Sequence, residues 1–328
     1  MTTDVAAAAD ALRAGKLVAF ATETVYGLGA NALDAGAVAR IFAAKDRPLF
    51  DPLIVHLAAP ESIGEVCNEV PPLAARLVEA FWPGPLTLVL PRRDGVPDLV
   101  TSGLPDVAVR VPDHTLAREL IRLAGVPIAA PSANLFGRVS PTTAAHVMEQ
   151  LDGRIDVVLD GGPCRVGVES TIVAFDDDGC PRVLRYGGLA IEALRAMCGE
   201  VRLPPARGGS GTDEMRAQPA PGMLEQHYAP RKPLTVVETL ARAGVDVLSG
   251  TETGALGVLA FRGLPAGLAA AVSETLSPRG SLEEAATNLF AALRRLDAAP
   301  VTRIVAERVP DEGLGRAIND RLRRASHR

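Results

Sequence analysis

The chain has 328 residues, which is long for a single hydrophobic core and indicates two domains. Hydrophobic residues make up 48% of it, whereas aromatic residues make up only 4%, fewer than a protein that stacks many single-stranded bases usually carries. The net charge of −5 gives no overall basic field that would attract nucleic acid, so we expect any RNA contact to be local or transient.

The placement of cysteine and histidine gives no indication of a transition-metal site. None of the four cysteines forms a CxxC pair and the five histidines do not cluster, so we expect reduced thiols without a metal. The first 16 residues lack the basic start of a signal peptide and suit a short amphipathic helix. No segment has the apolar length that spans a bilayer, so we expect a cytoplasmic protein.

The first two hundred residues combine short strands with helices. Eight segments rich in Val, Ile, Leu and Thr, bounded by Gly, Pro or Asp, are predicted to be strands: 17–22, 52–58, 86–91, 107–112, 126–132, 157–162, 170–175 and 182–186. Four segments with helical periodicity lie between them: 35–45, 72–81, 115–125 and 141–151. Several strands follow one another directly, so we predict a mixed α/β sheet rather than a regular doubly wound one.

Residues 203–233 differ from both flanking regions, because they are rich in Gly, Pro, Ser and charge and show little periodicity. A segment of this length is either a linker or a functional loop. The remainder combines predicted strands with amphipathic helices, which is typical of a small parallel sheet. The strands are predicted at 234–238, 254–261 and 303–309, and the helices at 283–298 and 314–326. The predicted organisation is a first domain at 1–203, a linker or lid at 204–232 and a second domain at 233–328.

The segment TETVYGLG (22–29) places hydroxyls and a carboxylate where a strand ends and a glycine-rich turn begins. Strand ends gather small ligands in α/β folds, but capping hydroxyls in a turn would give the same pattern, and both interpretations stay open. GLGANA (27–32) also matches the dinucleotide fingerprint, with Asp51 near the spacing of a ribose-binding acid. Five residues separate it from the preceding strand, which argues against an NAD(P)-dependent oxidoreductase.

Cations follow the predicted helix at 35–45. Lys45 and Arg47 precede a proline, and such a pair suits a triphosphate, although cations are favourable at any helix C-terminus. His56, at the end of an apolar strand, is either a ligand-binding or a core histidine. Arg110 lies inside an apolar strand, where it needs either an internal carboxylate or an anionic ligand such as an amino-acid carboxylate. Of these two, we favour the ligand.

Three further segments combine polar groups with strand ends or turns. APSANLFGRVSPT (130–142) offers hydroxyls, an amide and backbone N–H groups near a predicted helix N-terminus, with Ser140 as the N-cap before a proline, which suits phosphate binding. VGVEST (166–171) places a polar group beside a strand, and Arg185 ends the next strand. APGMLEQHYAP (220–230) holds apolar and aromatic residues that a flexible linker rarely needs, so we expect it to dock as a lid.

In seven motifs that occur in the family's order, the chain closely resembles the threonylcarbamoyl-AMP synthase family: ATETVYGLGANA, AKDRPLFDPLIVH, WPGPLTLVL, VAVRVP, PIAAPSANLFGRVSPT, DGGPCRVGVESTIV and APGMLEQHYAP. The tail GLGRAINDRLRRA (313–325) resembles the end of the family's longer members. The resemblance implies a YrdC-like catalytic domain, which is a twisted, partly open α/β barrel with a positively charged concave cavity. It also implies a smaller Rossmann-like C-terminal domain.

The resemblance further implies which residues form the site. The positions that hold L-threonine correspond to Thr24, His56, Arg110, Ser170 and the backbone of Ala130. The positions that hold ATP correspond to Arg47, Asp51, Ser132, Asn134, Ser140, Arg185 and Tyr228. Lys45 and Arg47 are expected to be the catalytic cations that face the phosphates. The family usually has Asn where this chain has Asp51, and the extra carboxylate adds negative charge near a triphosphate.

The reaction that the resemblance implies is nucleotidyl transfer. Threonine and bicarbonate give a carbamate, whose oxygen attacks the α-phosphate of ATP and releases pyrophosphate, with Mg²⁺ as cofactor and without a protein nucleophile. The expected partners are ATP, L-threonine, bicarbonate and the tRNA-modification machinery that accepts the adenylate. The main alternative is a non-catalytic, RNA-binding YrdC-like module. Carbamoyl transfer in metal-centre maturation is a further alternative, and the lack of zinc-finger cysteines argues against it.

Overall fold

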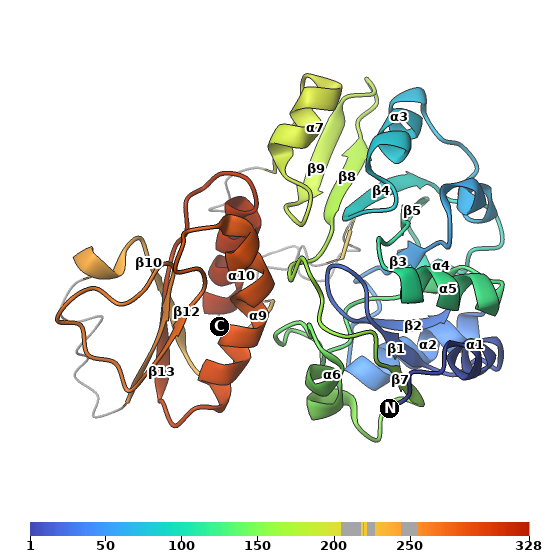
Figure 1. Cartoon of the computed structure of the whole chain (residues 1–328). Coiled ribbons are helices and arrows are strands. Elements are labelled where there is room, and N and C mark those ends of the chain that lie inside the picture. Colours follow the sequence, from blue (N-terminus) through green and yellow to red (C-terminus); the bar gives the residue numbers. More distant parts are fainter. Residues whose placement is uncertain (205–217, 219, 222–226, 244–254, 328) are drawn as a thin grey trace. The chain divides into compact units, whose positions relative to one another are not determined.

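The structure is a computed structural model that describes residues 1–204, 218, 220–221, 227–243 and 255–327 (Figure 1). Chain contacts divide it into two units. The first unit comprises residues 1–136, 141–165 and 169–224, and the second comprises 137–140, 166–168 and 225–328. Within the described ranges, no helix combines the length and apolar character needed to cross a membrane.

The first unit is built on a nine-stranded mixed sheet with the order β7-β1-β2-β6-β3-β5-β4-β8-β9. Its strands are β1 (Val18–Phe20), β2 (Gly27–Asn31), β3 (Ile54–His56), β4 (Leu86–Pro91), β5 (Asp106–Arg110), β6 (Ile128–Ala129), β7 (Val157–Leu159), β8 (Thr171–Phe175) and β9 (Pro181–Arg185). The pairs β1–β7, β3–β5 and β4–β8 are parallel, and the other neighbours are antiparallel. The predicted mixed α/β class is confirmed.

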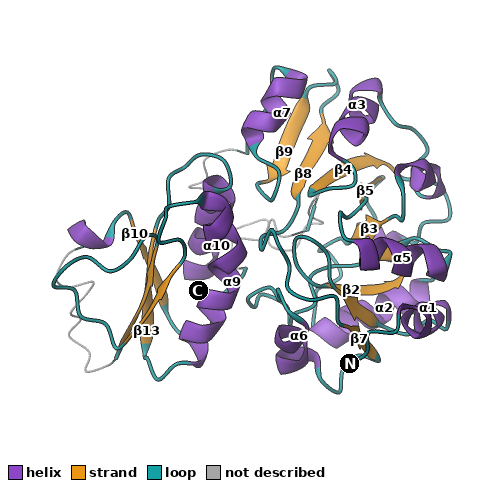
Figure 2. Cartoon of the chain, viewed as in Figure 1, coloured by secondary structure: helices purple, strands orange, loops and turns teal. Residues whose placement is uncertain are grey.

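Helices flank this sheet (Figure 2). They are α1 (Val5–Arg13), α2 (Ala35–Lys45), the 3₁₀ helix η1 (Pro60–Glu65), α3 (Pro72–Phe81), α4 (Asp98–Thr101), α5 (Thr115–Ala124), α6 (Ala144–Leu151) and α7 (Ile191–Cys198). The Asp34 carboxylate caps the N-terminus of α2 by accepting from two backbone N–H groups. Asp46, which is left-handed with φ 53°, caps its C-terminus and separates Lys45 from Arg47.

Two sequence-based predictions are wrong, one in each unit. GLGANA lies in strand β2 rather than in a glycine-rich turn. Its glycines serve packing, because a Cβ on Gly29 would lie 2.8 Å from side-chain atoms of Ile128 and Phe20. Glycine therefore allows close packing within the sheet. Ser140 is not an N-cap, because Thr143 caps α6, which begins three residues after Pro141. The carbonyl of Pro141 accepts from the backbone N–H of Tyr26 and not from a residue of α6, so Pro141 lies outside the helix.

The second unit contains a four-stranded parallel sheet with the order β10-β13-β11-β12, which confirms the predicted small parallel sheet. Its elements are β10 (Leu234–Val237), the 3₁₀ helix η2 (Leu240–Arg242), β11 (Leu256–Ala260), β12 (Val272–Thr275), α9 (Leu282–Ala298), β13 (Arg303–Glu307) and α10 (Gly315–Ser326). α9 and α10 pack on the same face of this sheet (Figure 1).

Two short pieces from the first two hundred residues belong to the second unit. The carbonyl of Gly137 accepts from the backbone N–H of Ala229 at 2.8 Å. Gly167, with φ 79°, approaches α9 so closely that a Cβ would lie 2.4 Å from the carbonyl oxygen of Ala286. The two units are therefore interleaved along the sequence. The predicted domain boundaries at residues 203 and 233 stay a prediction.

Candidate active site

The turn after β1 is closed by its own hydroxyls. Thr22 Oγ1 donates to the carbonyl of Val25 at 2.6 Å, accepts from the backbone N–H of Thr24 and lies 2.8 Å from Thr24 Oγ1. These bonds confirm the capping interpretation of the segment. They also fix the backbone of Glu23 and Thr24, whose side chains are buried.

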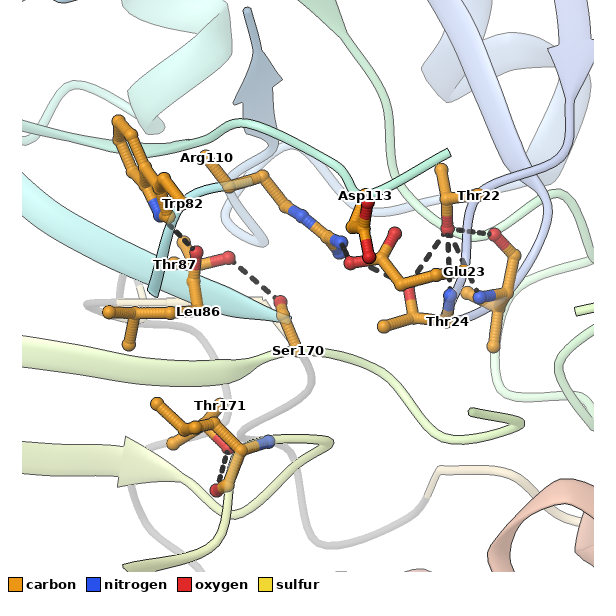
Figure 3. Close-up of polar contacts among 12 residues, drawn as sticks. Thr22, Glu23, Thr24, Trp82, Leu86, Thr87, Arg110, Asp113, Ser170 and Thr171 are labelled. Carbon is orange, nitrogen blue, oxygen red and sulfur yellow. Dashed lines mark hydrogen bonds and ion pairs between the residues drawn. The ribbon is translucent and has the colours of Figure 1, made fainter. Parts of the chain in front are cut away.

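Arg110 lies at the end of β5 and is 3% exposed. Its Nη2 forms an ion pair with Glu23, and its Nη1 donates to Thr24 Oγ1 at 3.1 Å. Figure 3 shows the guanidinium reaching toward Glu23 and Thr24. A buried guanidinium is costly without a carboxylate, and the structure supplies one from within the chain. The internal partner is thus present, and the favoured role of Arg110 in binding a ligand stays a prediction.

His56 is beside Arg110 because β3 and β5 are parallel and pair these two residues in register. Its Nδ1–H donates to the carbonyl of Ile54 at 3.1 Å. Burial, with a smaller contribution from the positive charge of Arg110, lowers the pKa of His56 to about 3. The imidazole is therefore neutral near pH 7, and its N–H is used on the carbonyl of Ile54.

Ser170 lies immediately before β8, and its Oγ is 2.7 Å from Thr87 Oγ1 on the neighbouring strand β4 (Figure 3). Arg185 at the end of β9 donates to the carbonyl of Ser170 at 3.0 Å and to its Oγ at 3.2 Å. Gly187 makes this arrangement possible, since a Cβ there would lie 2.3 Å from backbone atoms of residues 169 and 170. Two predicted site residues, Ser170 and Arg185, are therefore in direct contact.

A second group of predicted residues surrounds the C-terminus of α2. Lys45 Nζ donates to the backbone carbonyls of Ser132, at 2.6 Å, and Asn134. Burial and the nearby Arg47 charge lower the pKa of Lys45 well below its usual range. These two bonds tie Nζ of Lys45 to the loop after β6.

Arg47 is equally buried. Its Nη2 forms an ion pair with Asp51 Oδ2 at 2.9 Å, and it donates to the backbone carbonyls of Asp51 and Pro52. Its guanidinium carbon lies 6.0 Å from the ring centroid of Phe136. The extra carboxylate that the chain has at position 51 is therefore compensated by the neighbouring cation.

The backbone around Ala130 links these groups. The N–H of Ala130 donates to the carbonyl of Ile54, the same carbonyl that holds His56. Two residues further on, Ser132 forms an isolated antiparallel bridge with Gly27. Asn134 donates through Nδ2 to the carbonyl of Leu135 at 2.7 Å. Eleven predicted site residues thus lie in the first unit: Thr24, Lys45, Arg47, Asp51, His56, Arg110, Ala130, Ser132, Asn134, Ser170 and Arg185.

The other two predicted residues, Ser140 and Tyr228, lie in the second unit. Tyr228 has φ 64° and stacks on Phe290 of α9, with ring centroids 5.7 Å apart. The guanidinium carbon of Arg321 lies 5.3 Å from the Tyr228 ring centroid. Arg294 of α9 donates to the carbonyl of Val139 at 2.6 Å and reaches that of Ser140 at 3.5 Å. Helices of the C-terminal sheet thus hold both residues.

The predicted lid at 204–232 falls largely on residues outside the described part of the chain. Two of its described residues contact the rest of the first unit. The N–H of Gln218 donates to the carbonyl of Phe50 at 3.2 Å, and the carbonyl of Pro221 accepts from Arg185 at 3.1 Å. These contacts agree with docking of the segment near a predicted site residue, and the lid itself stays a prediction.

Sequence reasoning assigned no individual role to three buried polar residues. Glu23 pairs with Arg110, Thr87 pairs with Ser170, and the hydroxyl of Tyr26 donates to the carbonyl of Gly162 at 2.8 Å. Burial raises the pKa of Tyr26, which keeps the phenol protonated. The signal for Glu23 was available, because a carboxylate between two threonines at a strand end is unusual in a core.

Carboxylates and other potential ligands do not gather for a metal ion in the part of the chain that the structure describes. No group of three His, Cys, Asp or Glu side chains lies together there. Magnesium is often held by one or two carboxylates and by the phosphates of its nucleotide, so this arrangement leaves the Mg²⁺ prediction open.

Comparison with known proteins adds a family to this geometry. A family model described as telomere recombination matches residues 10–187, and one described as the threonylcarbamoyl-AMP synthase C-terminal domain matches residues 189–327. Proteins named threonylcarbamoyl-AMP synthase from Pyrococcus abyssi and Bacillus subtilis are 46% and 43% identical to the chain. These matches cover 97% and 98% of the chain, and 93% and 92% of the relatives.

A crystal structure of P. abyssi Sua5 complexed with L-threonine matches with a TM-score of 0.91 and 45% identity, covering 98% of this chain and 94% of that one. The similarity therefore extends through both units, and the expected fold of the family is confirmed. The chain belongs to the threonylcarbamoyl-AMP synthase family, in the form that carries the C-terminal domain.

Proposed function

We propose that the protein forms threonylcarbamoyl-AMP and pyrophosphate from L-threonine, bicarbonate and ATP. The observation that carries this proposal is the buried guanidinium of Arg110, which β5 holds beside Thr24 and His56. A buried guanidinium beside a carboxylate, a neutral imidazole and a hydroxyl suits a small amino acid with charged and hydroxyl groups. The relative of known structure that binds L-threonine supports the same substrate.

In the proposed complex, Arg110 binds the threonine carboxylate. The neutral His56 and the hydroxyls of Thr24 and Ser170 provide donors and acceptors for the rest of the molecule. A neutral imidazole is useful here because a second cation would compete for the carboxylate and repel the amino group.

ATP is proposed to bind at the end of α2 and the loop after β6. Arg47 contributes a positive charge near the phosphates, and Lys45 keeps the backbone of residues 132–134 in place. Mg²⁺ would enter with the nucleotide and offset charge on the pyrophosphate leaving group. Ser140 and Tyr228 are the remaining residues that the family resemblance predicts to contact the nucleotide.

The proposed chemistry needs no protein nucleophile. The amine of threonine attacks the carbon of bicarbonate, and loss of water leaves a carbamate. One carbamate oxygen then attacks the α-phosphorus of ATP while the bond to pyrophosphate breaks. Burial raises the pKa of the Cys67 thiol to about 12 and also raises that of Cys164, so neither buried cysteine is a thiolate at neutral pH. Positioning and charge stabilisation provide the rate enhancement.

The product is a mixed anhydride, which water hydrolyses. We therefore propose that it passes to tRNA-modification machinery, and that any contact of this acidic chain with tRNA is weak and local.

The decisive experiment measures pyrophosphate release by purified protein supplied with ATP, Mg²⁺ and bicarbonate, with and without L-threonine. We expect release that depends on both threonine and bicarbonate, and a loss of at least about 100-fold in R110A, because a charged anchor and its geometry are removed. The exposed R122A variant is the control, since Arg122 pairs with Glu119 at the surface of α5. Release independent of threonine would refute the proposal.

A further inference from the structure

Glu23 is a buried carboxylate that uses only one of its two oxygens. Its side chain is 0% exposed, and Oε1 forms the ion pair with Arg110. Within the described part of the chain, Oε2 has no hydrogen-bond partner, and neither does Nε of Arg110. A buried charged oxygen without a donor is costly, so a native protein retains one where a ligand or water completes it.

The groups around Glu23 do not provide the missing donor. Thr22 Oγ1 already donates to the carbonyl of Val25. Cys164 and His114 are close enough to feel the Glu23 charge, but neither forms a hydrogen bond with Oε2. Burial raises the pKa of the thiol and lowers that of the imidazole, so neither supplies a counter-charge near pH 7. Arg110 is thus the cation that neutralises Glu23, and it does so through the other oxygen.

The open oxygen and the guanidinium form a pair of opposite charges in direct contact. An α-amino acid carries the same two charges in reverse, on groups attached to one carbon atom. We propose that Oε2 of Glu23 binds the amino group of the amino-acid substrate while Arg110 binds its carboxylate. This inference rests on the proposed function, and it assigns to Glu23 the recognition of the substrate amine.

Charge balance favours a zwitterionic ligand at this pair. The Glu23–Arg110 pair is neutral overall, and a zwitterion is neutral too, so binding buries no net charge. A carboxylic acid without the amine would bury an additional negative charge beside Glu23 and leave Oε2 without its donor. The pair would therefore select amino acids over hydroxy acids of the same shape.

The contact is also compatible with the reaction. A carboxylate oxygen accepts from the N–H of an ammonium and from that of a neutral amine. Glu23 can therefore keep its hydrogen bond after the amine loses the proton that it must lose before attacking bicarbonate. With one N–H directed at Oε2, the nitrogen lone pair points away from Glu23.

The test compares binding of L-threonine and of 3-hydroxybutyrate, which lacks the amino group, by calorimetry without ATP. We expect the wild-type protein to bind threonine about 10- to 100-fold more tightly, the range of a charge-assisted hydrogen bond. In E23Q, which keeps the side-chain volume and removes the charge, we expect threonine affinity to fall by a similar factor. The ratio of the affinities for threonine and for 3-hydroxybutyrate should therefore be smaller in E23Q than in the wild type.

The matched control is E119Q, the same substitution in an exposed ion pair with Arg122, which should leave both affinities unchanged. Equal wild-type affinity for the two ligands would overturn the inference, and so would an E23Q variant that loses affinity for both to the same extent. Because the first comparison needs no variant, it decides the matter even where E23Q does not fold. Absence of threonine binding by the wild type would instead refute the proposed function.

Discussion

Arg47 and Asp51 form an ion pair with 2.9 Å between Nη2 and Oδ2, and neither side chain is more than 3% exposed. The carboxylate stabilises the buried guanidinium, but it also reduces the positive potential that a triphosphate would meet. Stability and nucleotide affinity therefore place opposite demands on position 51.

We expect D51N to lower the free energy of unfolding by about 3 kcal/mol, because it leaves a buried cation without its counter-ion. The same variant should lower KM for ATP by up to about tenfold, since Arg47 keeps its bonds to backbone carbonyls and gains net positive charge. Denaturant unfolding and pyrophosphate release against ATP concentration measure the two effects. The control is D98N, because Asp98 pairs with Arg92 and is 80% exposed, and it should change neither the stability nor the KM. A KM for ATP that is higher in D51N than in the wild type would contradict the prediction.

His56 should make the first unit less stable as the solution is acidified. Its pKa is about 3 when folded and about 6.5 when unfolded, so the unfolded chain binds more protons between these values. Stability is therefore present above pH 6.5 and falls toward pH 3, by at most about 1.4 kcal/mol per pH unit for this one group. Urea unfolding at pH 7 and pH 5, followed through Trp82 fluorescence, measures the slope.

The slope should become flatter in H56Q, which cannot titrate. It should be unchanged in H327Q, where the replaced histidine is exposed at the end of α10. An H56Q protein with the wild-type dependence on pH would show that other groups account for the acid sensitivity.

Gly187 should be essential for the contact between Ser170 and Arg185. In G187A the new Cβ would have to push away backbone atoms at 2.3 Å, so we expect a loss of about 1–3 kcal/mol of stability and weaker threonine binding. Trp82 fluorescence during thermal unfolding and threonine calorimetry provide the readouts. G64A is the control because no atom lies within 4 Å of the corresponding Cβ in η1, and a G187A protein that matches it would refute the steric argument.

Arg294 and Arg295 offer a matched pair of substitutions in the second unit. Arg294 is buried and donates to the Val139 carbonyl, whereas Arg295 is 57% exposed and pairs with Glu274. R294M should raise KM for ATP several-fold and speed hydrogen exchange at residues 137–140, because a buried carbonyl loses its donor next to Ser140. R295M should do neither, and equal effects of the two would exclude a specific role for Arg294.

The elements with strong local signals could be predicted from the sequence. α2 has its predicted bounds, 35–45, because an aspartate cap and a left-handed residue are both encoded next to the helix. β4 likewise has its predicted bounds, 86–91, as a run rich in Leu, Val and Thr that is ended by proline. Strand β12 was not predicted, because only partly buried or exposed side chains make up its four residues.

Long-range contacts were harder to predict. The glycines of β2 fit against Phe20 and Ile128, and Ile128 lies about a hundred residues further along the chain, where no local pattern reveals it. The partner of Arg110 is Glu23, 87 positions away, so the sequence could show that a carboxylate or ligand was needed but not which one. Whether the thirteen predicted site residues bind substrates stays a prediction.

The bond between Arg294 and Val139 spans 155 residues of chain, which has a consequence for synthesis on the ribosome. At about 5–20 residues per second, roughly 8–30 s separate the translation of the loop from that of its donor. During that interval the first nine strands can already pair, since all their partners precede residue 186. The loop at 137–140 must wait for α9, so a nascent chain acquires its sheet well before the segment that carries Ser140 reaches its final contacts.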